Sequence, residues 1–298
     1  MAVPMDVKRK GRASLKSERR RALVWSYVFL VIFALFFLTP PVYMLITSFK
    51  TNAEISMAAA PWWIHQPTLG NYAELLSSSA YLGFFRNSAL VSLLVVAITM
   101  AVSIPAAFAL SRMRFWGSAA LAAGVFLTYL VPETLLFIPL FKMFITIHEA
   151  TGIELINHWW VLVLLYPTLT VPFCTWIMIG YFASIPKELD EAAVMDGAGY
   201  VQILVRIFIP VALPGIIAAT IFAFTVSWAQ FLYPLAFITS VDQLVLPVGI
   251  ITTLIRGDVF TWGQIMTGAL LGAAPPLVIY AFLMDYYIAG LTAGATKG

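Results

Sequence analysis

Residues 87–110 read NSALVSLLVVAITMAVSIPAAFAL and contain no charged side chain. A helix needs about 20 predominantly apolar residues to cross the hydrocarbon core of a bilayer, so this segment is long enough to span a membrane. Its hydrophobicity is also too continuous for the alternating pattern of a transmembrane β-strand. We therefore predict a membrane-spanning helix here.

Further apolar segments meet the same test at residues 25–49, 118–145, 158–181, 208–238 and 264–287. The segment 208–238 holds Pro210, Pro214 and Pro234, which predict a distorted start or a bend. The chain of 298 residues is 61% hydrophobic and only 10% charged, whereas soluble domains carry about 25% charged residues. The sequence thus predicts an all-α integral membrane protein with six transmembrane helices.

The basic residues predict the orientation of the spans, because Lys and Arg are enriched on the cytoplasmic side. One side receives Lys8, Arg9, Lys10, Arg12, Lys16, Arg19, Arg20, Arg21, Arg112, Arg114, Lys187, Arg206 and Lys297, and the other side receives Lys50, Arg86 and Arg256. We expect both termini to be cytoplasmic. Residues 1–24 would form a basic N-terminus, 25–287 the transmembrane domain and 288–298 a tail. The first span is too long for a signal-peptide core, so we expect it to be retained.

Motifs of catalysis and cofactor binding are missing from the sequence. It has no GxxxxGK[ST] loop for ATP phosphates and no GxSxG nucleophile elbow. The single cysteine, Cys174, excludes an intrachain disulfide, and His65, His148 and His158 lack the spacing of a metal site. We predict that the chain is not an enzyme and binds no cofactor itself.

The connection at residues 182–207 is unusual for a loop between spans. Ser184 is a candidate helix cap, and Pro186 suits the first turn of the helix that follows. Ala193 and Gly197 are four residues apart, which predicts a helix face with little side-chain bulk, and Gly199 is a candidate end of the helix. An interfacial helix on lipid is one interpretation. The acids and alanines favour a protein partner, since lipid anchors carry Lys and Arg beside large apolar residues.

This connection resembles the EAA motif of ABC importer permeases, which reads EAA, three residues, Gly, nine residues and I-x-L-P. The matching residues are Glu191, Ala192, Ala193, Gly197, Ile207, Phe208, Ile209 and Pro210, with Ile209 in place of the usual Leu and Asp196 beside the glycine. Further stretches resemble carbohydrate-importer permeases, at residues 61–72, 86–88 and 107–112. The tail at residues 289–298 resembles that of the smaller membrane subunit of maltose-type importers.

The resemblance implies a type I ABC importer permease fold with a cytoplasmic EAA coupling helix. In this family two homologous permease subunits form the pathway, two ATPase subunits carry ATP and Mg, and an extracytoplasmic solute-binding protein delivers a sugar, oligosaccharide or polyol. The residues expected to contact the ATPase are Glu191, Ala192, Ala193, Asp196, Gly197, Ile207 and Pro210, with Gly294 and Lys297 in the tail. The implied location is the inner membrane of a bacterial or archaeal cell.

Polar residues inside the spans are candidates for the solute pathway, because burying them in lipid is costly. The candidates are Glu133, Thr220, Ser227, Trp228, Gln230, Tyr233 and Asn87. Glu133 has an alternative place at the membrane edge or against another helix, and the Ser and Thr residues also suit helix packing. A stand-alone secondary transporter or channel is the alternative function. It calls for ion sites or an inverted repeat, and the sequence displays neither.

Overall fold

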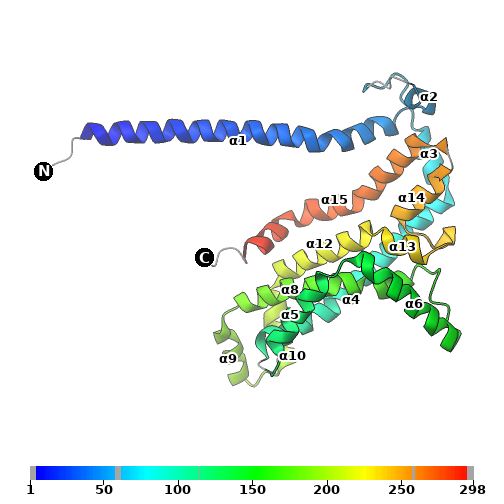
Figure 1. Ribbon diagram of the computed structural model, residues 1–298. Helices are drawn as coiled ribbons and strands as arrows, with labels where there is room; N and C mark the ends of the chain where they lie inside the picture. The colour runs from blue at the N-terminus through cyan, green and yellow to red at the C-terminus, as the bar shows by residue number, and fades with distance from the viewer. Residues whose placement is uncertain (1–4, 58–61, 114, 257–258, 294–298) are drawn as a thin grey trace. The chain divides into compact units, whose positions relative to one another are not determined.

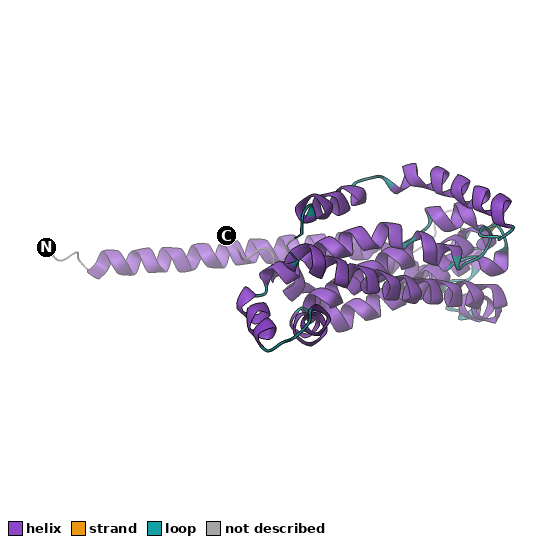
Figure 2. Ribbon diagram, turned by 90° about the horizontal axis from the view of Figure 1, so that it is seen from below, coloured by secondary structure: helices purple, strands orange, loops and turns teal. Residues whose placement is uncertain are grey.

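The computed structural model describes residues 5–57, 62–113, 115–256 and 259–293. These ranges are nearly all helical, as Figure 2 shows. A short antiparallel pair of strands interrupts the helices near the end of the chain. The described elements follow in this order (Figure 1): α1 Met5–Ser48, α2 Asn52–Ile55, α3 Gly70–Ser77, α4 Ser79–Arg112, α5 Ser118–Tyr129, α6 Glu133–Thr151, α7 Val161–Leu165, α8 Pro167–Ser184, α9 Lys187–Met195, α10 Tyr200–Ile203, the π-helical turn η1 Leu204–Phe208, α11 Ile209–Val211, α12 Leu213–Ala229, α13 Leu232–Phe237, the 3-10 turn η2 Val241–Gln243, α14 Leu246–Leu254, β1 Ile255–Arg256, β2 Val259–Phe260 and α15 Trp262–Ala293.

The chain divides into two compact units, residues 1–72 with 262–270 and residues 73–261 with 271–298. In the first unit, Asn71 donates its amide hydrogens to the carbonyls of Ser48 and Lys50, both at 2.9 Å. The carboxylate of Glu54 accepts the backbone N–H of His65 at 2.9 Å. That hydrogen bond lowers the pKa of the Glu54 carboxyl. These contacts fix the connection that follows the first span.

The core of the second unit lies where α4, α8 and α12 pack together (Figure 1). The helices approach closely at small residues: a Cβ at Gly215 of α12 would lie 2.4 Å from the ring of Tyr181 on α8. The hydroxyls of Thr99 and Thr170 are 2.6 Å apart between α4 and α8, and the Cys174 thiol donates to the carbonyl of Ala219. The Thr99, Thr170 and Cys174 side chains thereby find partners within the apolar bundle, as burial in a membrane favours.

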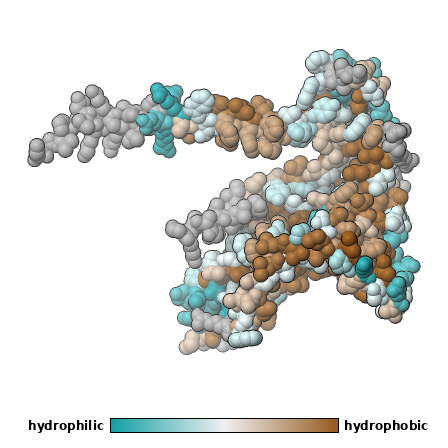
Figure 3. All heavy atoms as spheres, viewed as in Figure 1, coloured by the Kyte–Doolittle hydropathy of each residue, from teal (hydrophilic) through white to brown (hydrophobic). Residues whose placement is uncertain are grey.

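Five described helices are long and apolar enough to cross a membrane, or six if one bent pair counts as a single span. The five spans are Glu18–Ser48, Ala80–Arg112, Glu133–Thr151, Val161–Ser184 and Trp262–Met284, and the bent pair is Tyr200–Val211 with Leu213–Ala229. In Figure 3 a hydrophobic band covers the second unit, with hydrophilic surface near α9 and near the end of α6. This pattern fits a protein that crosses the membrane several times.

Two predicted spans are discontinuous. The segment predicted at 118–145 is divided into α5 and α6, because Pro132 has no N–H to continue the helix and disfavours helical geometry at Val131. The segment predicted at 208–238 bends by 81° at its start and breaks again after Ala229. The predicted bend is therefore confirmed. The second break, at Gln230, was not predicted, and Pro234 lies inside α13.

Candidate functional site

Arg112, the last residue of α4, joins four elements at one end of the second unit. Its guanidinium donates to the carbonyls of Phe182 and Ile185, which close α8, and pairs with the carboxylate of Asp190 on α9 at 3.2 Å. Its Cζ lies 4.9 Å from the ring centroid of Phe208 in η1, a cation–π contact. The side chain is only 8% exposed. We call these contacts the Arg112 clamp.

The ion pair of the clamp is partly buried, and its two charges depend on each other. Burial raises the pKa of the Asp190 carboxyl, while the positive charge of Arg112 acts in the opposite direction. The Asp190 side chain is 23% exposed, so water screens the pair in part. The clamp therefore holds α9 against the ends of α4 and α8 by charge and hydrogen bonds together.

The exposed face of α9 differs from the predicted small-residue face. Glu191 and Ala192 are exposed, whereas Ala193 is only 8% exposed and belongs to the core cluster with Phe182 and Phe208. Because the Ala193 side chain faces inward, it packs α9 against the core and is not part of a surface for a partner. The surface that α9 presents combines the acids Glu188 and Glu191 with exposed apolar side chains, which are Leu189, Val194 and Met195.

Gly197 has a conformational role at the end of α9. Its φ is +79°, and the N–H of Ala198 bonds the carbonyl of Ala193 while the N–H of Gly197 bonds that of Val194. This is a Schellman motif, which favours glycine at the left-handed position. The helix thus ends at Met195, with Gly197 as the left-handed residue after its cap, and not at the predicted Gly199, which precedes α10. Ser184 ends α8, so Pro186 takes the cap position of α9.

The remaining residues of the motif follow in the irregular segment after α10. Ile207 is partly buried and packs on the core cluster from the π-helical turn η1. Pro210 is exposed at the start of α11, just before the 81° bend. Asp196 is the exposed C-cap of α9. Gly294 and Lys297 of the predicted tail contact lie outside the described residues.

Glu133 and Gln230 meet where two helices are discontinuous. Glu133 begins α6, and its Oε2 accepts a hydrogen bond of 2.9 Å from Nε2 of Gln230, which follows α12. The amide oxygen of Gln230 accepts the backbone N–H groups of Phe231 and Leu232, which the break sets free. The polar side chains therefore satisfy the broken backbone, as broken membrane helices require.

A pocket of about 290 Å³ opens beside this junction. Its lining comes from α5, α6, α8 and α12 with the link between α5 and α6, and consists of Thr128, Tyr129, Leu130, Val131, Pro132, Glu133, Leu136, Thr168, Leu169, Phe222 and Val226. Tyr166 and Tyr233 lie nearby, fully buried, with ring centroids 6.4 Å apart. Among the described residues, the Tyr166 hydroxyl has no hydrogen-bond partner. The pocket thus brings together the predicted pathway residue Glu133 with a group of polar side chains.

The other predicted pathway residues have local structural partners. Both amide hydrogens of Asn87 bond the carbonyls of Asp242 and Leu244, and its side chain is fully buried. The indole N–H of Trp228 bonds the carbonyl of Gly272 at 2.8 Å, and the Ser227 hydroxyl bonds Ala223 on its own helix. Thr220 is half-buried on α12. None of these residues lines the pocket beside Glu133.

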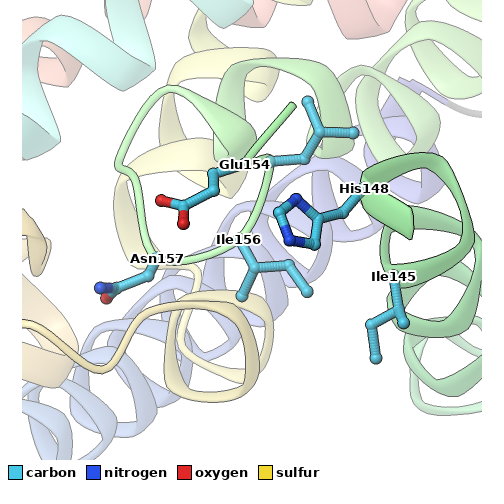
Figure 4. Close-up of a pocket in the computed structure, with 6 residues that line it drawn as sticks. Ile145, His148, Glu154, Ile156 and Asn157 are labelled. Atoms are coloured by element: carbon cyan, nitrogen blue, oxygen red, sulfur yellow. The ribbon is translucent and has the colours of Figure 1, made fainter. Parts of the chain in front are cut away.

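A second pocket of about 260 Å³ lies in the connection after α6 (Figure 4). Ile145 and His148 reach it from α6, while Glu154, Ile156 and Asn157 come from the loop. Among the described residues, no group of three His, Cys, Asp or Glu side chains is arranged to hold a metal. The lining residues connect the end of α6 to the loop before α7, and we call this region the Asn157 junction.

Asn157 holds that junction together. It adopts a φ of +67°, and its amide oxygen accepts the N–H groups of Thr239 and Ser240 at 2.9 and 2.7 Å. Its amide nitrogen donates to the Ser240 hydroxyl at 2.7 Å, and its backbone N–H bonds the carbonyl of Phe237. The side chain thus ties the loop after α6 to the loop after α13.

Replacing Asn157 with glycine is expected to lower the free energy of unfolding by about 2 kcal/mol, because the side-chain hydrogen bonds to Thr239 and Ser240 are lost. Glycine accepts the positive φ, so the loss reports the hydrogen bonds alone. Thermal unfolding of the purified protein in detergent measures this loss of stability. The stability of Asn157→Asp, which keeps the acceptor oxygen, should lie between those of the wild type and Asn157→Gly. A melting temperature unchanged in Asn157→Gly would contradict the structural role.

Sequence reasoning missed the Arg112 clamp and the Asn157 junction. Arg112 counted only as an orienting charge, and Ile185, which it bonds, is 73 residues further along the chain. Asn157 gave no signal beyond its place in a loop. A basic residue at the end of an uncharged span was the available hint for Arg112, because Lys and Arg there bond the free carbonyls of a helix end.

Comparison with known proteins places this architecture in a family. Residues 94–292 match the family described as "binding-protein-dependent transport system inner membrane component". The chain is 34% identical over 262 residues to the sulfoquinovosyl glycerol transport system permease protein of Agrobacterium fabrum, covering 88% of this chain and 89% of the relative. It is 30% identical over 271 residues to the trehalose/maltose transport system permease protein of Thermococcus litoralis, covering 90% and 94%.

The fold is also found in a solved structure. A chain of a bacterial ABC transporter involved in the import of the acidic polysaccharide alginate superposes with a TM-score of 0.76 at 21% identity, covering 91% of this chain and 98% of that chain. At this identity the likeness concerns the fold, and it confirms the predicted type I permease architecture. By the match over most of its length, the chain belongs to the binding-protein-dependent transport system inner membrane component family.

Proposed function

We propose that this permease forms one half of the membrane pathway of an ATP-driven importer for a sugar or polyol, and that α9 docks on an ATPase subunit. The observation that carries the proposal is the Arg112 clamp. It fixes a short acidic helix with an exposed face to the ends of two spans. A displacement of a helix held in this way is transmitted to the membrane-spanning helices, because the packed elements move together.

The coupling residues divide into two groups. Glu191, Ala192 and Asp196 are exposed and would contact the ATPase directly. Two further residues, Ala193 and Ile207, would act indirectly, because they pack on the core and hold the coupling region in place. Gly197 would also act indirectly, because it sets the end of the helix. When ATP with Mg closes the ATPase subunits, α9 would be displaced, and the spans held by the clamp would move with it.

The partners follow from the family and its relatives. The family description names a binding protein, which supports an extracytoplasmic solute-binding protein as one partner. A second homologous permease would complete the pathway, and two ATPase subunits of one or two kinds would supply the energy. The names of two relatives refer to sulfoquinovosyl glycerol and to trehalose and maltose, which supports a sugar or sugar derivative as the solute.

The orientation follows from charge. The α9 end of the second unit carries Arg112, Lys187 and Arg206, so we place it in the cytoplasm together with both termini. The loop with Asn157 then faces the outside, where a binding protein would approach. The membrane would be the inner membrane of a bacterial or archaeal cell.

Purification in mild detergent at native expression, with mass spectrometry of the associated proteins, tests the proposal. We expect a P-loop ATPase and a second permease of the same family to co-purify, and solute uptake by reconstituted vesicles to need ATP. If the chain purifies alone and transports without ATP, it works as a stand-alone secondary transporter or channel, and the proposed coupling role of α9 is wrong.

A further inference from the structure

The pocket beside Glu133 lies where discontinuous helices meet within the membrane domain. The break between α5 and α6 and the break between α12 and α13 are joined by the hydrogen bond from Gln230 to Glu133. Binding sites of membrane transporters are often built at such breaks, because the backbone there offers polar groups at the depth of the bilayer. The pocket thus offers a polar solute the Glu133 carboxyl and the hydroxyls of Thr128, Tyr129 and Thr168.

The charge of this pocket is negative. Glu133 lines it, and no Lys, Arg or His is among the lining residues that the structure describes. The Gln230 amide occupies only one carboxylate oxygen, and among the described residues the other, Oε1, has no hydrogen-bond partner. A carboxylate accepts hydrogen bonds from hydroxyl or ammonium groups and repels another acid at short range.

The walls of the pocket are aromatic and apolar. Tyr129 stacks on Phe173 with ring centroids 4.7 Å apart, and Phe173 lies 4.2 Å from Phe222, which lines the pocket. Thr128 and Thr168 add hydroxyl groups. An apolar wall with a few placed polar groups is the usual composition of a small-molecule site. The volume of about 290 Å³ lies at the small end of ligand pockets, which start at roughly 300 Å³, so it suits a solute no larger than a single sugar ring.

We infer that this pocket binds one ring of a sugar, or a polyol, that carries no acidic group, with Glu133 accepting hydrogen bonds from its hydroxyls. The inference rests on the proposed function and sets the charge of its solute. The alginate importer, whose name gives an acidic polysaccharide, shares the fold. Sulfoquinovosyl glycerol, named for a relative that is 34% identical, carries an acidic group as well, a sulfonate. Neither the fold nor the family therefore fixes the charge of the solute, and the inference of a solute without an acidic group rests on the side chain of Glu133.

Binding of three sugars that share one skeleton tests this inference: glucose, glucosamine and glucuronate. The probe is the melting temperature of the purified permease, with the subunits that co-purify, as each sugar is titrated. We expect glucose and glucosamine to bind at least about 10-fold more tightly than glucuronate. In Glu133→Gln this preference should fall to within roughly 2-fold, because the repelling charge is gone while the size of the side chain is kept.

Glu149→Gln is the matched control, since Glu149 is an exposed carboxylate on the same helix and lies outside the pocket. This variant should keep the wild-type preference. The inference is overturned if glucuronate binds the wild type as tightly as glucose, if no sugar of the three binds, or if Glu133→Gln keeps the preference. None of these results touches the proposed function, which fails instead if no ATPase co-purifies and uptake needs no ATP.

Discussion

Replacing Arg112 with alanine is expected to lower the free energy of unfolding by about 3 kcal/mol and to uncouple ATP hydrolysis from uptake. The change leaves the carbonyls of Phe182 and Ile185 and the Asp190 carboxylate without the guanidinium. A partly buried charge that loses its partner is costly, and α9 loses its tie to α4. Thermal unfolding in detergent measures the first effect. The ratio of ATP hydrolysed to solute taken up by reconstituted vesicles measures the second.

The pH dependence of this variant follows from Asp190. Burial raises the pKa of the Asp190 carboxyl, and without Arg112 the main opposing charge is gone. A carboxyl with a higher pKa in the folded protein than in the unfolded chain destabilises the fold above that pKa. The cost disappears as the pH falls and the folded carboxyl takes up a proton. Arg112→Ala should therefore recover part of its lost stability at lower pH, and Arg112→Ala with Asp190→Asn should not.

Two further variants separate coupling from general damage. Arg112→Lys keeps the charge but loses the planar fork that bonds two carbonyls at once, so it should be intermediate in both measurements. Arg206→Ala removes one exposed positive charge from the same end of the unit and should behave like the wild type. Equal ratios of ATP to solute in Arg112→Ala and Arg206→Ala would refute the coupling role of the clamp.

The spans were predictable because hydrophobic length is a local property. Residues 87–110 form part of one helix as predicted, and the helix continues through Pro105. The division of residues 118–145 was not predicted, although Pro132 lies within it. Prolines in membrane helices often only bend them, so the sequence does not say which proline ends a helix.

The contacts of the candidate sites were harder to predict because they join distant parts of the chain. Glu133 was predicted as a pathway residue from its cost in lipid, but its partner Gln230 lies 97 residues further on. The spacing of Ala193 and Gly197 predicted that both residues lie on one helix face, and this prediction is wrong, because Ala193 is buried and Gly197 is exposed beyond the end of α9. Helical periodicity holds only as far as the helix extends, and tertiary packing decides which face of it is buried.

Gly197 provides the second large expected effect. Its φ of +79° is a conformation that costs other residues about 1–2 kcal/mol, and valine tolerates it least because it is branched at Cβ. We expect Gly197→Val to unwind the end of α9 and to reduce ATP-driven uptake by roughly tenfold, which corresponds to about 1.4 kcal/mol. Uptake by reconstituted vesicles at equal protein content is the measurement.

Gly197→Asn decides why glycine is needed. A Cβ at this position would meet no atom of the chain within 4 Å, so space within the permease does not restrict the side chain. Asparagine tolerates the left-handed conformation, and Gly197→Asn should retain most of the uptake if glycine serves the backbone. If the glycine instead lets an ATPase subunit approach closely, asparagine and valine should impair uptake alike. The Schellman hydrogen bonds of Gly197 and Ala198 favour retained uptake in Gly197→Asn, because they explain the need for a left-handed residue here without any bound partner.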